Sequence, residues 1–154
     1  MQADQFTKAL LALLDETFDK VKGYYLDEGN SLFETLAGIT AEEASIPVGG
    51  RCATLAAQVK HVAFYLETVD NSVRDPNYPR VDWTEIWRTV AAVTPAEWQT
   101  IQDDLRRAYD QILALARSTP DWRDETDIGG AIAVVAHTAY HLGEIRQALC
   151  VIRQ

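Results

Sequence analysis

Three histidines are the residues of this 154-residue chain whose type and spacing could do chemistry. His137 and His141 stand four positions apart in a helical pattern, so both imidazoles project from one helix face. Two imidazoles at that spacing can chelate one divalent cation at roughly 2.0–2.1 Å. From a facing helix, His61 would complete a three-ligand site with open positions for water or substrate. The alternative is three ordinary core or surface histidines without a metal.

Polar and aromatic residues near the histidines could support such a site. Glu144 extends the histidine face and is the candidate catalytic residue, as an acceptor for a ring N–H, a fourth ligand or a base. The alternative is a solvated glutamate. Tyr65 and Tyr140 either line a pocket or are ordinary core aromatics. The four tryptophans are expected to seal the bundle ends rather than to bind a ligand: Trp83, Trp87, Trp98 and Trp122.

Other chemical templates fail. Gly129-Gly130 has no preceding strand and lacks the Lys-Ser/Thr of a phosphate loop. No pair of helices carries the Glu-x-x-His motif of a di-iron carboxylate bundle. Cys52 and Cys150 match no metal-ligand spacing and are expected to be buried or half-buried thiols.

Apolar residues recur at steps of three and four in four long segments, which predicts four amphipathic helices. Capping hydroxyls or carboxylates followed by Glu also predict short helices that begin at Ser31, Thr40 and Asp82. The long helices are expected over about Ala3–Val21, over Ala53–Arg74, from the Thr94-Pro95 cap to just before Pro120, and from a cap at Asp127 nearly to the C-terminus.

Four amphipathic helices can bury their apolar stripes only against one another. The sequence therefore predicts an all-α fold, a four-helix bundle with long crossover connections and short helices in the loops, as one domain over residues 1–154. Only the link from Pro120 to Asp127 is short. The third and fourth long helices are accordingly expected to be antiparallel neighbours.

Composition limits the partners. Hydrophobic residues make up 47% and charged residues 24%, as in a soluble globular protein, and the net charge of −9 argues against nucleic acid. No apolar run approaches the roughly 18 residues of a membrane span. The N-terminus lacks a signal-peptide pattern and cysteines are few, so a cytoplasmic location is expected.

The stretch His137-x-x-x-His141-x-Gly143-Glu144-Ile145-Arg146-Gln147, with His61 on an earlier helix, resembles the DinB/YfiT-like superfamily. Residues 32–40 and the Trp83…Trp87…Thr94-Pro95-Ala96-Glu97-Trp98 stretch are also similar to that family, and the resemblance covers the whole chain. It implies a bundle with long crossovers, a homodimer, and a divalent metal held by His61, His137 and His141. The family commonly has Gln at the position of Glu144.

The resemblance leaves two main functions open. Some members of the family are thiol S-transferases or a thiol-dependent isomerase, which implies a Zn²⁺- or Ni²⁺-dependent transferase acting with a low-molecular-weight thiol. The alternative is a non-catalytic, dimeric metal- or small-ligand-binding bundle of stress-response type. A third possibility is an interaction module whose histidines are structural.

Overall fold

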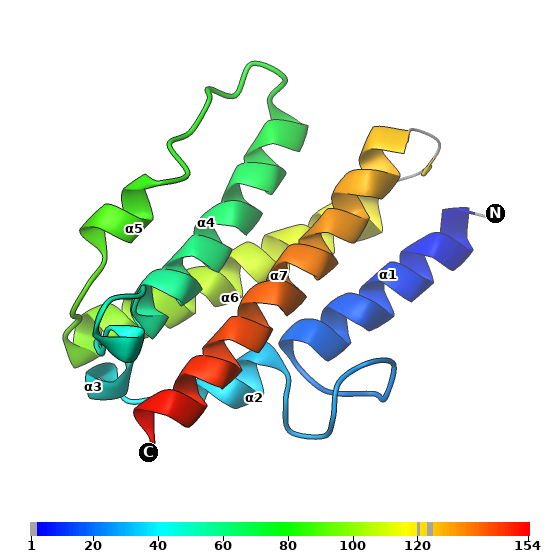
Figure 1. Ribbon diagram of the computed structural model, residues 1–154. Helices are drawn as coiled ribbons and strands as arrows, with labels where there is room; N and C mark the ends of the chain where they lie inside the picture. The colour runs from blue at the N-terminus through cyan, green and yellow to red at the C-terminus, as the bar shows by residue number, and fades with distance from the viewer. Residues whose placement is uncertain (1–2, 120, 123–124) are drawn as a thin grey trace.

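The computed structural model describes residues 3–119, 121–122 and 125–154, and its regular structure is entirely helical over those ranges (Figure 1). This confirms the all-α prediction. Four long helices carry most of the chain: α1 (Ala3–Phe18), α4 (Leu55–Arg74), α6 (Pro95–Ser118) and α7 (Glu125–Ile152). The short elements are α2 (Leu32–Leu36), α3 (Ala41–Ala44), the 3₁₀ turn η1 (Val48–Gly50) and α5 (Glu85–Thr89).

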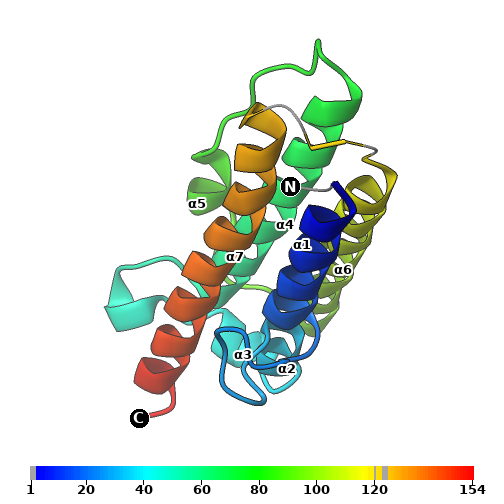
Figure 2. The ribbon, with the colours of Figure 1, turned by 90° about the vertical axis from the view of Figure 1, so that its right-hand side faces the viewer.

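The four long helices lie side by side, and α1 and α4 each pack against both α6 and α7 (Figures 1 and 2). Helices α6 and α7 run antiparallel but lie diagonally opposite each other, so the prediction that they are neighbours is wrong. The six residues between Ser118 and Glu125 can extend to roughly 20 Å, which is enough to reach diagonally across one end of the four long helices. Within this link, positions 120, 123 and 124 lie outside the described residues.

The connection from α4 to α6 is a long crossover. It leaves the C-terminal end of α4, returns along the outside of that helix with α5, and delivers the chain to the start of α6 at the opposite end (Figure 1). Helices α4 and α6 are therefore parallel. The return path also carries Trp83 and Trp87 alongside α4.

Side-chain caps determine where several helices begin. Thr94 Oγ1 accepts the N–H of Glu97 at 3.2 Å while the Glu97 carboxylate accepts the N–H of Thr94 at 2.7 Å, which confirms the predicted capping box of α6. At α4 only one half of such a box is present: Thr54 Oγ1 accepts the N–H of Ala57 at 3.2 Å, and the helix begins at Leu55 rather than Ala53. Asp127 is not the cap of α7, because it lies within the first turn of the helix. Its negative charge there interacts favourably with the positive end of the helix dipole.

Helix α1 ends at Phe18, three residues before the predicted Val21. The cause is Glu16, which is fully buried and whose carboxylate accepts four backbone N–H groups of the following loop. These donors bend the chain back over the helix end and prevent a further helical turn. They are Lys22, Tyr24, Tyr25 and Leu26, at 2.6–3.1 Å.

Two predicted short helices begin where expected and one does not. Capping residues Ser31 and Thr40 directly precede α2 and α3. Asp82 instead accepts the N–H of Thr84 at 2.8 Å, which holds the chain in a turn, and α5 begins only at Glu85.

The core lies between the four long helices and consists of aliphatic and aromatic side chains. Phe18 stacks on Tyr109 with ring centroids 4.4 Å apart. The fully buried side chains include Leu14, Phe18, Leu66, Leu105, Leu142 and Ile145. Among the helices of the described residues, none has the length and apolar character needed to cross a membrane.

Candidate metal centre

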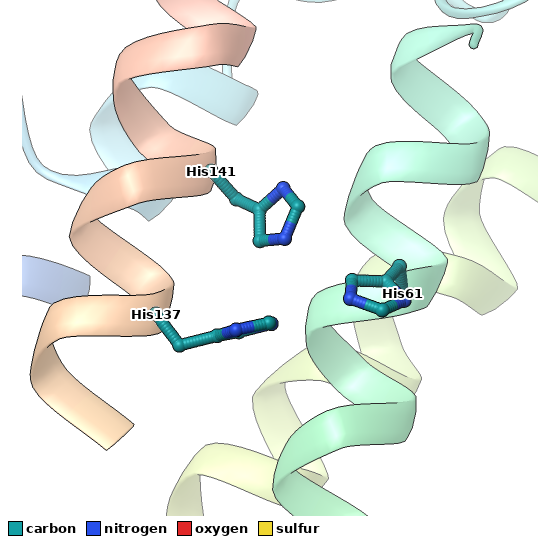
Figure 3. Close-up of side chains that lie close together, drawn as sticks. All are labelled: His61, His137 and His141. Atoms are coloured by element: carbon teal, nitrogen blue, oxygen red, sulfur yellow. The ribbon is translucent and has the colours of Figure 1, made fainter. Parts of the chain in front are cut away.

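The three histidines meet between two adjacent antiparallel helices. His61 projects from α4, and His137 and His141 project from successive turns of α7, with all three rings directed toward one another (Figure 3). Their ring centroids are 4.6–5.2 Å apart, and one nitrogen from each ring lies within 4.8 Å of the others. The residues predicted as ligands are thus brought together by the fold.

The histidines occupy the border between the core and the crossover segment. Leu142 and Ile145 continue the same helix into the core and are fully buried. On the other side, the indole of Trp87 packs against His61 at 4.5 Å between ring centroids. As a result, His61 is only 7% exposed and His141 only 5%.

The orientation of His141 is set by two acceptors on its Nδ1. Gln58 Oε1 lies 2.6 Å from that nitrogen and Glu144 Oε2 lies 3.0 Å from it. Since both partners are acceptors, Nδ1 carries the hydrogen and Nε2 keeps its lone pair. Glu144 also accepts the hydroxyl hydrogen of Tyr140 at 2.7 Å. The candidate catalytic residue Glu144 therefore holds a histidine ring in place.

The other two rings contain buried nitrogens without a partner. Nδ1 of His61 and Nε2 of His137 have no hydrogen-bond partner among the described residues. A buried polar atom left unsatisfied costs about 1–3 kcal/mol. A bound cation is one partner that satisfies such a nitrogen without a further protein group.

Burial keeps the three imidazoles neutral at neutral pH. It lowers the pKa of His61 to about 4, with His141 adding to the effect and Glu144 opposing it. Burial, with His141 and His61, likewise lowers the pKa of His137 to about 4. The pKa of His141 is also lowered by burial, although Glu144 opposes the change. Neutral imidazole is the form that binds a metal.

The donor set fits a divalent transition metal with some closure of the rings. Three nitrogens bound tetrahedrally at 2.0–2.1 Å lie about 3.4 Å apart, compared with the limit of 4.8 Å observed here. Rotation about the side-chain torsions can supply this adjustment. Among the described residues, the cluster of potential ligand groups contains the three histidines and no carboxylate or cysteine.

Aromatic side chains surround the cluster. Tyr65 stacks on His137 with ring centroids 3.9 Å apart and planes 20° apart, and it also lines a cavity, which is the first of the two alternatives that the sequence left open for it. The ring centroid of Trp83 lies 6.4 Å from that of His61, and the ring centroid of Trp87 lies 4.5 Å from it. The prediction that these two tryptophans seal the bundle ends is therefore wrong, because the crossover carries them along the side of α4.

The other two tryptophans contribute to packing. Trp98 is buried, and its Nε1 donates to the carbonyl of Ile39 at 2.9 Å. Trp122 packs edge-on against Phe6, near the start of α1. Neither belongs to the histidine cluster.

Gln58 is the main contact that the sequence analysis missed. It precedes His61 by three residues, so both side chains lie on the same side of α4. The spacing of Gln58 and His61 indicates that Gln58 can contact His141 only when it is known that His61 faces His141.

The expectation of buried or half-buried cysteines is wrong, since both thiols are exposed. Cys52 lies in the loop before α4, and Cys150 lies on the outer side of the last turns of α7.

Comparison of the chain with protein-family models, with curated proteins and with solved structures finds no match to any of them. The functional argument therefore depends on the geometry and chemistry of the histidine cluster.

Proposed function

We propose that this chain is a divalent-metal-binding four-helix bundle of the DinB/YfiT-like type and acts as a metal-dependent thiol S-transferase. His61, His137 and His141 would hold Zn²⁺ or Ni²⁺, since imidazole nitrogen suits both ions. The reaction would join a low-molecular-weight thiol to an electrophilic small molecule. The packing of the four long helices and the resemblance around His137 and His141 support this assignment.

The observation that carries the proposal is the composition of the cluster. Three imidazole nitrogens lie within 4.8 Å of one another, and no fourth side-chain ligand joins them among the described residues. Structural zinc sites are closed by four protein ligands, whereas catalytic sites use three and leave a position for water or substrate. The donor count therefore favours a reactive site over a structural one.

A bound divalent cation lowers the pKa of a coordinated thiol, so that thiolate is available at neutral pH. In the proposed reaction the thiolate sulfur displaces a leaving group from carbon. A C–S bond forms while the bond from that carbon to the leaving group breaks. The leaving group departs with the electron pair of the broken bond, and the thiol proton passes to solvent.

The chain's own residues would orient the ligands and exclude water. Gln58 and Glu144 hold His141 with its Nε2 lone pair free, as their contacts with Nδ1 require. Tyr65 and Trp87 cover His137 and His61 with apolar ring surface.

We further propose a homodimer formed through α7. Exposed positions of this helix between residues 128 and 152 carry no charge, and three large apolar side chains project there. A second copy offering the same face would cover them in a two-fold symmetric contact. These side chains are Ile132, Tyr140 and Val151, which are 55%, 62% and 43% exposed.

The decisive experiment measures metal content by elemental analysis and thiol transfer on untagged protein. We expect close to one equivalent of Zn²⁺ or Ni²⁺ in the wild type and none in His137→Ala/His141→Ala. Ile132→Ala/Gln147→Ala alters two exposed positions of the same helix and should retain the metal.

Each result has a defined meaning. Metal-dependent conversion of 1-chloro-2,4-dinitrobenzene with a small thiol supports the transferase. Full metal loading without turnover of several thiols and electrophiles rejects catalysis and favours the non-catalytic binding protein. Absence of metal after reconstitution with Zn²⁺ and Ni²⁺ rejects both.

A further inference from the structure

A cavity of about 320 Å³ lies between the four long helices, on the side of Tyr65 away from the core around Leu142. Its buried wall is contributed by all four of these helices and is aliphatic except for Thr68 of α4. This volume is at the lower end of the range for small-molecule sites. The buried aliphatic wall residues are Leu10, Leu14, Ile112, Ala116 and Val134.

The cavity and the histidine cluster share a wall. Tyr65 and Trp83 both line the cavity, and their rings lie 6.0 Å apart. The Tyr65 ring is also stacked on His137, with ring centroids 3.9 Å apart, and the ring centroids of Trp83 and His61 are 6.4 Å apart. A molecule in the cavity is therefore separated from the histidines by one layer of aromatic side chains.

The opposite end of the cavity opens to solvent where α4 ends and α7 begins. Exposed residues surround this mouth, including Val73, Asp127 and Gly130. Asp127 is the one charged side chain among the described lining residues, and it lies at the exposed end. The interior thus offers no counter-charge to an ionic ligand.

Thr68 brings a hydroxyl without a hydrogen-bond partner within the described residues to the buried part of the cavity wall, where the residue is 7% exposed. Because a threonine in a helix has two accessible χ1 rotamers, rotation about χ1 can turn this hydroxyl toward a ligand in the cavity. A ligand with a single polar group can be accommodated here, whereas a charged one cannot.

We propose that this cavity binds an uncharged, predominantly apolar small organic molecule, and that this molecule is the electrophile of the transferase. The second part rests on the proposed function, and the first does not. The apolar body of the ligand occupies the aliphatic interior, and its reactive end faces Tyr65 and Trp83. Displacement of the Tyr65 ring opens the way to His137.

The test uses two fluorescent probes with the same ring system, the neutral N-phenyl-1-naphthylamine and the anionic 8-anilino-1-naphthalenesulfonate. Titration of metal-free folded protein should show saturable binding of the neutral probe. The sulfonate should bind more weakly, on the order of tenfold or more, because its charge finds no partner inside. Equal affinity for the two probes would contradict an apolar interior site.

Two neighbouring glycines provide matched variants. Gly129 and Gly130 are both helical and exposed, and a Cβ added at either meets no atom within 4 Å, but only Gly130 lines the cavity. Gly130→Leu should weaken binding of the neutral probe by about tenfold or more, while Gly129→Leu leaves it unchanged. Ala131→Leu, at a second lining position, should act as Gly130→Leu does. Equal binding by all three variants would overturn the cavity site.

Metal loading separates this proposal from the proposed function. Co²⁺ loaded into the protein would report on the histidine site through its visible absorption spectrum. The neutral probe should change that spectrum in wild type and in Gly129→Leu, and not in Gly130→Leu. Probe binding without any metal binding would reject the transferase and retain the cavity site. Probe binding with an unchanged cobalt spectrum would reject the link between them.

Discussion

Glu144 Oε2 lies 3.0 Å from Nδ1 of His141, less than one helical turn away along α7. Gln58 approaches the same nitrogen from α4 at 2.6 Å. Two helices therefore act on one ring, and both contacts leave Nε2 as the atom that faces the other histidines with a lone pair. This relationship gives Glu144 a positioning role beside the candidate metal ligands.

Removal of either acceptor should weaken metal binding. We expect Glu144→Ala and Gln58→Leu each to lower Zn²⁺ affinity by about 10–100-fold, because the His141 tautomer and orientation are no longer held. Glu144→Gln retains an acceptor oxygen and should lose less. Competition titration against a chromogenic chelator gives the affinities, with Gln147→Ala as the control on an exposed α7 position. Wild-type affinity in both Ala and Leu variants would rule out the positioning role.

Metal binding should stabilise the fold. At a free Zn²⁺ concentration 100 times its Kd, binding to the native state alone contributes about 2.7 kcal/mol. For a chain of this size that corresponds to a rise in Tm of about 5–10 °C. Thermal unfolding followed by circular dichroism should show this rise in wild type, its reversal by a chelator, and no rise in His137→Ala/His141→Ala. A rise of the same size in the double variant would place the metal elsewhere.

Glu16 should contribute an acid-dependent part of the stability. Burial raises the pKa of its carboxyl, but the four backbone N–H donors outweigh this and lower the pKa from 4.5 to about 2. The unfolded chain then takes up the proton first as pH falls. Stability from this group is present above about pH 4.5 and is lost as pH falls toward 2.

Urea unfolding of wild type and Glu16→Gln at neutral and acid pH measures that contribution. The variant should be less stable at neutral pH, and the difference between the two proteins should shrink as pH falls below 4.5. Glu28→Gln, at an exposed position of the same loop, should behave as wild type. A difference that stays constant with pH would show that Glu16 acts without its charge.

The exposed face of α7 should mediate self-association. We expect wild type to sediment as a dimer at micromolar concentration and Ile132→Asp as a folded monomer, because a charge at a 55% exposed position harms only an interface. Ile46→Asp introduces the same charge at another exposed apolar residue and should remain dimeric. A monomeric wild type would refute the dimer.

Local signals in the sequence predict much of the helical framework. Steps of three and four between apolar residues mark the long helices, and local caps such as Thr94 with Glu97 mark several starts. These signals are local, since they depend on residues within one or two turns. The spacing of His137 and His141 likewise determined that the two rings share a face of α7.

Features that depend on distant parts of the chain follow instead from how the helices and loops pack together. The early end of α1 follows from a buried carboxylate that binds a loop, and the diagonal placement of α6 and α7 follows from which faces pack. Gln58 and Trp87 reach the histidines because α4 packs on α7 and a crossover returns along α4. Such contacts join residues far apart in sequence, and no periodicity records them.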